Sequence, residues 1–265
     1  MLDYTRDGAI ATLTIRRAEK KNAFNMAMWR SLLAHCQRIA AESVAERVVA
    51  EPAGAPRVLL LQGQPGAFCA GADIEEMQTL IQDAAGMAAN NAVVAQAQLA
   101  LEQLPLATIA VVDGPCFGGG FGVAAACDFR IGSTRSLFAI TPARLGLVYS
   151  LEDTRRVVAL LGPTRAKRLL MRSERLDAAT ALQWGVLDAL VEPGALADTS
   201  REWAQQLAAQ SRTSLTGIKA TVALIEGNPS MNEPQLRAAF DAAFAGTDFA
   251  EGTAAFLARR APRFD

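Results

Sequence analysis

The pattern of hydrophobic and polar positions divides the chain into a strand-rich first part and a helical second part. Small or apolar residues alternate with threonine over residues 9–15, which predicts a strand. Continuous apolar runs at 58–62 and 108–112, each bounded by turn residues, predict buried strands. Further short strands are expected at 129–133 and 137–140.

Helical spacing appears between and after these strands. It predicts an amphipathic helix over residues 26–47, a proline- and glycine-containing connection at 50–56, and a helical stretch from Asp73 to Leu104. A glycine-rich turn then opens a short helix over 119–127. The later predicted helices are 151–160, 164–171, 178–184, 197–210, 214–226, 234–245 and 249–259. This order predicts an α/β core with a helical C-terminal extension.

Composition narrows the class of protein. The 265 residues are 51% hydrophobic and 20% charged, which is ample for a packed core. Lys plus Arg is 26 against 27 for Asp plus Glu, so the chain is no polycation and we expect no nucleic-acid partner. No apolar run approaches the ~20 residues that span a bilayer, and the N-terminus lacks a signal-peptide pattern. We therefore expect a cytoplasmic protein that does not bind membranes.

Cysteine and histidine usage argues against metal and hydrolase sites. The four cysteines lie at wide, irregular spacing without a C-x-x-C pair, so we interpret them as reduced and mostly buried thiols. His35 is the single histidine and lies in a predicted helix, where a position at the surface or helix edge is favoured over catalysis. We expect no metal.

Two loops could carry chemistry, because each lies between a buried strand and a helix. They are Phe68–Asp73 and Gly114–Gly122. Three consecutive glycines at 118–120 permit a tight turn, and at a helix start they leave backbone N–H groups directed outward. Such donors hold a phosphate or the oxyanion that forms on a carbonyl. The alternative is that the glycines serve only close packing of the helix on the strand.

Five segments, in order, resemble motifs of the crotonase superfamily, also called the enoyl-CoA hydratase/isomerase family. The second matches F-x-A-G-A-D, and the third matches G-G-G-x-E-L-x-x-x-C-D except at the glutamate. The segments are Arg17–Ala23, Phe68–Asp73, Gly118–Asp128, Arg175–Leu187 and Glu251–Arg260.

The resemblance implies a crotonase-like spiral of ββα units over residues 1–195 and a C-terminal helical trimerisation region over 196–265. It implies an acyl-CoA substrate from fatty acid metabolism, with coenzyme A present only as part of that substrate and no other cofactor. It also implies a homotrimer or a dimer of trimers.

The resemblance further implies roles for individual residues. The thioester carbonyl is expected to be held by the backbone N–H groups of Ala72 and Gly119, which would stabilise an enolate. The residues expected to contact coenzyme A are Lys20, Lys21, Ala70, Asp73, Ile74, Phe256 and Arg259. In relatives the last two reach the coenzyme A of a neighbouring subunit. For the two lysines and the arginine, a solvated surface charge is the alternative.

Both glutamates that a hydratase of this family uses are replaced. Gly122 stands at the place of the first and Pro142 at the place of the second. Neither residue can move a proton, so isomerisation or another proton transfer is favoured over fast hydration. Two alternatives stay open: a non-catalytic acyl-CoA-binding or regulatory subunit, and a decarboxylase-like enzyme.

Other residues could take over the missing chemistry. The segment around Tyr149 resembles one in a decarboxylase of the family, whose tyrosine lines the acyl pocket; a structural role is the alternative. Glu152 and Asp153 are the nearest carboxylates along the chain and would relay a proton or shape the acyl end. The competing interpretation is capping of a helix, because Ser150 precedes Asp153 at N-cap spacing. Asp73 and Glu75 are likewise expected to cap the next helix.

Overall fold

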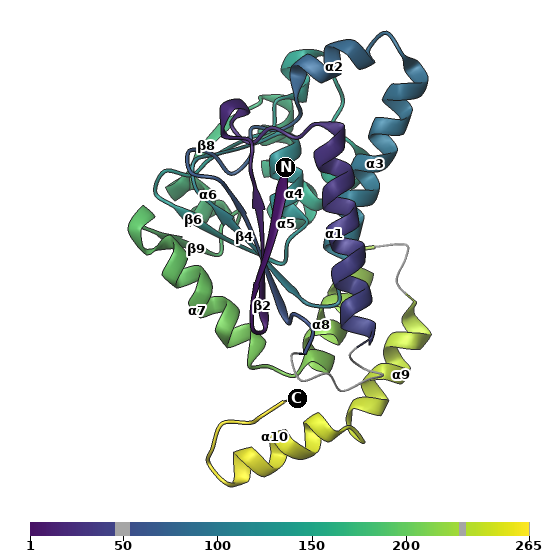
Figure 1. The fold of residues 1–265 in the computed structure, drawn as a ribbon, viewed down its shortest axis with the longest axis vertical. Coiled ribbons are helices and arrows are strands. Elements are labelled where there is room, and N and C mark those ends of the chain that lie inside the picture. The colour runs from purple at the N-terminus through teal and green to yellow at the C-terminus, as the bar shows by residue number, and fades with distance from the viewer. Residues whose placement is uncertain (46–53, 228–231, 265) are drawn as a thin grey trace.

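The computed structural model describes residues 1–45, 54–227 and 232–264, and a six-stranded sheet forms the centre of this part of the chain (Figure 1). The strands run in the order β1-β2-β3-β4-β6-β9. Their bounds are β1 (Leu2–Asp7), β2 (Ile10–Ile15), β3 (Val58–Gly63), β4 (Ala107–Val112), β6 (Phe129–Ser133) and β9 (Ala189–Val191).

The register of these strands places two loops side by side. β1 and β2 form an antiparallel pair, whereas β2, β3, β4, β6 and β9 pair in parallel. Neighbouring parallel strands end at the same edge of a sheet. The segments that follow β3 and β4 therefore start next to each other. A second, small sheet stands beyond that edge and consists of β5 (Pro115–Phe117), β7 (Leu137–Ala139) and β8 (Arg175–Asp177).

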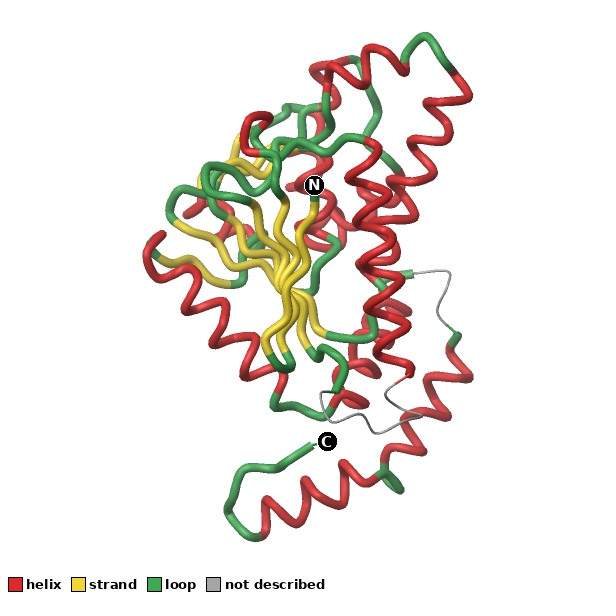
Figure 2. The backbone as a smooth tube through the Cα atoms, in the orientation of Figure 1, coloured by secondary structure: helices red, strands yellow, loops and turns green. Residues whose placement is uncertain are grey.

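Helices cover both faces of the main sheet (Figure 2). Leu59 and Leu61 of β3 point into the larger core, which includes residues of α1 (Met26–Ala45) and α3 (Ala84–Glu102). Val58 and Leu60 point to the opposite face, where α7 (Leu196–Ala208) packs. All four leucine and valine side chains are buried, as a parallel strand with both faces covered requires.

The remaining helices surround this core. Figure 1 shows α2 at one end of the molecule and α9 and α10 at the other, away from the sheet. The elements are η1 (Ala18–Lys20), α2 (Ile74–Leu80), α4 (Gly119–Ala125), η2 (Pro142–Leu145), α5 (Leu151–Met171), α6 (Ala178–Trp184), η3 (Pro193–Ala195), α8 (Arg212–Ile225), α9 (Glu233–Ala243) and α10 (Thr247–Leu257).

The predicted mixed α/β class with a helical C-terminal part is confirmed, but the prediction missed several strands. β5, β8 and β9 have three residues each, too few to show a period, and β1 is mostly exposed and polar. The predicted break between helices near residue 162 is present, because Gly162 has φ 71° and interrupts α5 just before Pro163. Residues 46–47 of the predicted first helix and 50–53 of the predicted connection lie outside the described residues.

The predicted division at residue 195 stays a prediction. α7 contacts β3, β4 and β6, so this first helix of the C-terminal part lies directly on the sheet. Within the described ranges, no helix is both long and apolar enough to cross a bilayer. All four cysteines are free and buried, as predicted.

Candidate active site

Backbone hydrogen bonds join the two candidate loops. Cys69 N donates to Pro115 O over 3.0 Å, and Phe117 N donates to Cys69 O over 2.9 Å. A third segment joins the first loop, because Phe24 N donates to Gly71 O and Asp73 N donates to Phe24 O, both at 2.8 Å. The backbone of residues 69–73 is thus held on both sides, which leaves little freedom in the direction of its N–H groups.

This arrangement brings Ala72 and Gly119 together. A Cβ atom on Gly119 would lie 3.8 Å from Ala72 N, and one on Gly71 would lie 3.6 Å from Gly119 N. Gly119 is the first residue of α4, where an N–H group has no acceptor within the helix. Among the described residues, neither the Ala72 nor the Gly119 N–H has an internal acceptor. Two N–H groups without an internal acceptor therefore lie close to each other.

Gly118 and Gly120, on either side of Gly119, must be glycine for two different physical reasons. Gly118 has φ 50° and ψ −114°, a conformation that strongly favours glycine. Gly120 faces the first loop so closely that a Cβ there would lie 2.4 Å from Cys69 O. The packing interpretation therefore holds for Gly120, while Gly119 is the glycine whose N–H group is available.

Tyr149 is tied to the glycine turn. Its hydroxyl donates to Gly118 O over 2.9 Å, and Gly122 N donates to the same oxygen over 3.1 Å. Burial, followed by the negative charge of Asp153, raises the pKa of the Tyr149 hydroxyl well above its ordinary value. The hydroxyl is thus a stable donor that supports the conformation of Gly118.

Asp153 is a buried carboxylate at the start of α5, whereas its neighbour Glu152 is exposed. Ser150 is the N-cap of α5 and accepts from Asp153 N over 3.0 Å, so the predicted capping is confirmed. The Ser150 hydroxyl also donates to Asp153 Oδ2 over 3.0 Å. Ser150 thus caps α5, and the Asp153 carboxylate next to it is buried.

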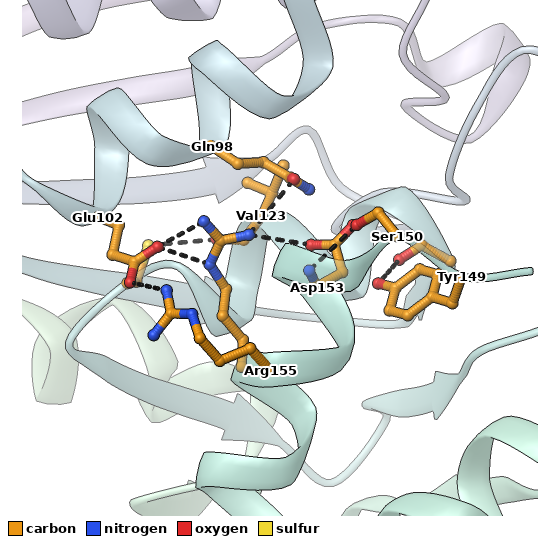
Figure 3. Close-up of polar contacts among 10 residues, drawn as sticks. Gln98, Glu102, Val123, Tyr149, Ser150, Asp153 and Arg155 are labelled. Carbon is orange, nitrogen blue, oxygen red and sulfur yellow. Dashed lines mark hydrogen bonds and ion pairs between the residues drawn. The ribbon is translucent and has the colours of Figure 1, made fainter. Parts of the chain in front are cut away.

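An arginine pairs Asp153 with a second, partly buried carboxylate (Figure 3). Arg156 donates to Asp153 Oδ1 over 3.2 Å and to Glu102 Oε2 over 2.8 Å, and its side chain is 4% exposed. Arg155 donates to the other oxygen of Glu102 over 2.6 Å. The positions of Glu102 on α3 and Asp153 on α5 are thus fixed relative to each other.

The pKa values of the two carboxyl groups shift in opposite directions. Burial raises the pKa of Asp153 above its ordinary value, although Arg156 and Ser150 favour the charged form. Burial acts on Glu102 in the same direction, but Arg156 and Arg155 together lower its pKa below the ordinary value. The two carboxyl groups therefore differ in acidity: the Glu102 carboxyl favours its charged form more than usual, and the Asp153 carboxyl favours it less.

Gly122 leaves space that other side chains fill. A Cβ atom at this position would lie 2.5 Å from Asp153 Oδ1 and 2.4 Å from Gln98 Nε2. Gly122 follows Gly119 by three residues, so both lie within one turn of α4. Because Gly122 has no side chain, the Asp153 carboxylate and the Gln98 amide pack directly against it.

Sequence reasoning missed Gln98, Glu102 and Arg156. The only sequence signal was that Gln98 and Glu102 are four residues apart and so share one face of a helix. Which face of that helix meets α5 could not be deduced from the spacing.

The residues predicted to contact coenzyme A lie in two separate places. Four of them lie in the first loop or next to it: Lys20, Lys21, Ala70 and the half-exposed Ile74. Lys20 pairs with Glu75 at 2.5 Å. Asp73 pairs with Arg17 at 2.6 Å and caps α2 by accepting from Glu75 N, which confirms the predicted capping. The Arg17 hydrogen bond lowers the pKa of Asp73.

Phe256 and Arg259 lie elsewhere. Phe256 is on α10 and 83% exposed, and Arg259 follows that helix at an exposed position. Figure 1 shows α10 at the end of the molecule opposite to α2. Within one chain, the structure does not bring these two residues to the loop at 69–74.

Metal chemistry and thiol chemistry find no support in the described part of the chain. No group of three potential ligands is found there. His35 stacks on Tyr4 at a helix edge, with ring centroids 5.9 Å apart. Burial raises the pKa of Cys36, Cys69 and Cys127 to about 12, so these thiols stay protonated.

Comparison with known proteins identifies a matching family and several named relatives. The sequence profile described as enoyl-CoA hydratase/isomerase matches residues 5–265. The chain is 30% identical to 1,2-epoxyphenylacetyl-CoA isomerase of Escherichia coli, over 100% of this chain and 97% of that protein. It is 28% identical to ethylmalonyl-CoA decarboxylase of Rattus norvegicus, over 82% of this chain and 70% of that protein.

The solved structures agree with this placement. The crystal structure of an enoyl-CoA hydratase/isomerase family protein from Hyphomonas neptunium superimposes with a TM-score of 0.88 at 32% identity, over 100% of this chain and 97% of that one. The predicted crotonase-like fold is therefore confirmed. Relatives that share this scaffold are named as hydratase, isomerase or decarboxylase, so the scaffold alone does not specify the reaction. The chain belongs to the enoyl-CoA hydratase/isomerase family.

Proposed function

We propose that this chain is an enzyme that binds an acyl-CoA thioester and moves a proton on its acyl group through an enolate-like intermediate. The observation that carries the proposal is the pair of unoccupied N–H groups, at Ala72 and Gly119, from two loops that are held together. Removing a proton beside a thioester shifts negative charge onto the carbonyl oxygen. Two fixed donors at that oxygen stabilise this charge more than they stabilise the neutral substrate.

Asp153 is our candidate for the group that moves the proton. It is buried, lies beside Gly122 within one helical turn of Gly119, and has a raised pKa. As a carboxylate it would accept a proton from one carbon of the acyl chain, and as the acid it would return that proton to another carbon. A double bond would thereby change position with no net change in protons. Glu152 is exposed and does not share these properties.

Fast hydration is less well supported. Gly122 and Pro142 replace the two glutamates that hold and deliver water in hydratases of this family, and neither side chain can exchange a proton. One buried carboxylate suits a proton that leaves and returns. A second candidate, favoured by these same replacements, is a non-catalytic acyl-CoA-binding subunit. A decarboxylase-like reaction is a further variant, because one relative is named as a decarboxylase.

We also propose that the chain assembles as a homotrimer or a dimer of trimers. The C-terminal helices carry large apolar side chains that are at least half exposed within one chain. Phe240 and Phe244 are on or next to α9, and Phe249, Phe256 and Leu257 are on α10. These side chains are exposed in a single chain, and packing against another copy would remove them from water. Such packing would also allow Phe256 and Arg259 to approach the coenzyme A of a neighbour. Light scattering after size-exclusion chromatography measures the assembly.

A matched pair of variants at Gly119 tests the site. Gly119→Pro removes one of the two N–H donors at the first helical position, where proline is favoured, and Gly118 has no Cβ to clash with the ring. Gly119→Ala keeps the N–H group and adds only a Cβ, 3.3 Å from Trp29. The assay is exchange of the α-protons of acetyl-CoA in deuterated water, with crotonyl-CoA and a 3-enoyl-CoA as further substrates.

We expect the proline variant to lose about 10²–10³-fold in rate relative to the alanine variant. Equal rates in the two folded variants would contradict the role of the Gly119 N–H group. No exchange in the unmodified protein, with thioester binding intact, would favour the non-catalytic subunit. Hydration at the rate of a two-glutamate enzyme would refute the preference for proton transfer.

A further inference from the structure

Arg156 is a buried cation that two carboxylates share, and they share it unequally (Figure 3). Its Nε atom donates to Glu102 Oε2 over 2.8 Å, and one of its two NH₂ groups also donates to that oxygen. The other NH₂ group donates to Asp153 Oδ1 over 3.2 Å. Glu102 thus takes the two shorter bonds of the guanidinium, and Asp153 receives one longer bond.

A second arginine holds Glu102 in place. Arg155 donates to Glu102 Oε1 over 2.6 Å, so both oxygen atoms of this carboxylate are engaged. Glu102 is the last residue of α3, whereas both arginines lie on α5. A carboxylate that accepts from two guanidinium groups keeps its negative charge, in agreement with the lowered pKa of Glu102. Arg156 therefore faces a second negative charge besides Asp153.

This second charge limits the effect of Arg156 on Asp153. A guanidinium with no other partner would turn two N–H groups toward Asp153, which is the strongest pairing geometry of arginine. A neighbouring arginine typically lowers the pKa of an aspartate by about 1–3 pH units, and Asp153 would then be a weak base. With Glu102 in place, the Asp153 carboxyl favours its charged form less than usual, because burial outweighs the single bond from Arg156.

The other groups around Asp153 do not compete for Arg156 in this way. The polar and titratable side chains around the carboxylate, besides Arg156 and Glu102, are Tyr149, Ser150, Glu152 and Gln98. Burial raises the pKa of Tyr149, so this hydroxyl keeps its proton, and Ser150 and Gln98 carry no charge. Glu152 is exposed, so water and salt screen its charge. From α4, Gly122 contributes no side chain. Among these groups, Glu102 is the one that draws Arg156 away from Asp153.

We propose that Glu102 is a positioning residue for proton transfer: it holds Arg156 by the shorter bonds, leaves Asp153 a single bond from the guanidinium, and so keeps Asp153 able both to accept and to return a proton. This inference rests on the proposed role of Asp153. In this role Glu102 contacts neither the substrate nor the transferred proton. It acts on Asp153 through Arg156, from the end of α3.

Carboxyl ¹³C NMR of Asp153, followed against pH, tests the inference without an activity assay. In Glu102→Gln, which has the same shape and no charge, we expect the midpoint of the Asp153 titration to fall by about one pH unit, because Arg156 is left to Asp153. Glu102→Asp restores the charge and should return the midpoint toward that of the unmodified protein.

Glu152→Gln is the matched control, because it removes the same charge from an exposed residue next to Asp153. In about 1 M salt it should leave the midpoint nearly unchanged, whereas the shift in Glu102→Gln should persist because the Arg156 contact is buried.

Exchange of thioester α-protons in deuterated water gives the second readout. In Glu102→Gln the rate should begin to rise about one pH unit lower than in the unmodified protein, since the Asp153 carboxylate forms at lower pH. The plateau should also be lower, because a weaker base removes a proton more slowly. A loss of equal size at every pH, with an unshifted midpoint, would show that Glu102 has only a structural role.

The outcomes separate the two proposals. If the Asp153 midpoint does not move in Glu102→Gln, or moves equally in Glu152→Gln at high salt, the positioning role is refuted while proton transfer by Asp153 stands. If the unmodified protein does not exchange α-protons, the proposed function fails and the positioning role falls with it, whatever the NMR midpoints are.

One measurement needs no variant and so does not depend on the folding of Glu102→Gln. In the unmodified protein, Glu102 must titrate at lower pH than Asp153, although the ordinary pKa values of 4.5 and 3.8 have the opposite order. Titration of Asp153 before Glu102 as the pH rises would overturn the inference.

Discussion

Asp153 Oδ1 lies 2.5 Å from the point where a Cβ atom of residue 122 would stand. This distance is far below a van der Waals contact, so a side chain at position 122 and the present position of the Asp153 carboxylate exclude each other. The chain lacks a glutamate at this position, and a carboxylate from another helix approaches the same place. The candidate proton-transfer group thus comes from α5 instead of α4.

Gly122→Ala is expected to destabilise the fold, because the new methyl group must displace Asp153 and Gln98 from a close-packed interior. Overpacking of this kind typically costs about 1–3 kcal/mol. Gly217→Ala is the matched control, since Gly217 also lies in a helix but has nothing within 4 Å of its Cβ position. There, alanine should be neutral or stabilising. Denaturant unfolding measures both, and equal stability of the two variants would show that the space at Gly122 is larger than described.

Asp153→Asn is expected to lower α-proton exchange of a thioester by about 10²–10⁴-fold, because an amide cannot accept the proton. In the unmodified protein the rate should rise as the pH rises through the pKa of Asp153, since only the carboxylate acts as a base. Burial places that pKa above the ordinary value of 3.8. Glu152→Gln, one residue away and exposed, is the control and should keep the rate. A loss in Glu152→Gln with activity retained in Asp153→Asn would reverse the assignment.

Tyr149→Phe removes one of two donors to Gly118 O and leaves the donation from Gly122 N over 3.1 Å. We expect a loss of stability of about 1 kcal/mol, typical of one hydrogen bond. The pKa of Tyr149 is raised well above 10, so the hydroxyl stays protonated and the pH–rate profile near neutrality should keep its shape in the variant. A changed profile in Tyr149→Phe would indicate that the tyrosine itself transfers a proton.

The C-terminal segment should loosen in acid because of Glu251. Hydrogen bonds from Arg260 and from Arg263 N lower the pKa of this carboxyl from 4.5 to about 2. A lowered pKa means that the contact stabilises the folded segment at pH values above 4.5 and is lost as the pH falls towards 2. The NMR shift of the Arg263 amide should follow this titration. In Glu251→Gln the shift should no longer change over this pH range. An Arg263 amide that titrates identically in that variant would rule out Glu251 as the cause.

Much of the fold and part of the site follow from local sequence. Buried strands such as β3 and β4 are visible as apolar runs, and the caps at Asp73 and Ser150 follow from residues a few positions apart. The two glycine-bearing loops were also predictable, because glycine permits backbone conformations, such as the positive φ of Gly71 and Gly118, that other residues rarely adopt. Short-range patterns of this kind need only neighbours along the chain.

The tertiary structure alone decided which side chains complete the site. Gln98, Glu102 and Arg156 belong to helices whose own patterns do not specify which faces meet, and the three contact one another only after α3, α4 and α5 pack together. Sequence patterns likewise could not separate Asp153 from Glu152, two adjacent carboxylates of which one is buried and one exposed. Backbone conformation is a local property of the chain, whereas burial, pairing and the pKa of a carboxylate depend on groups brought close by folding.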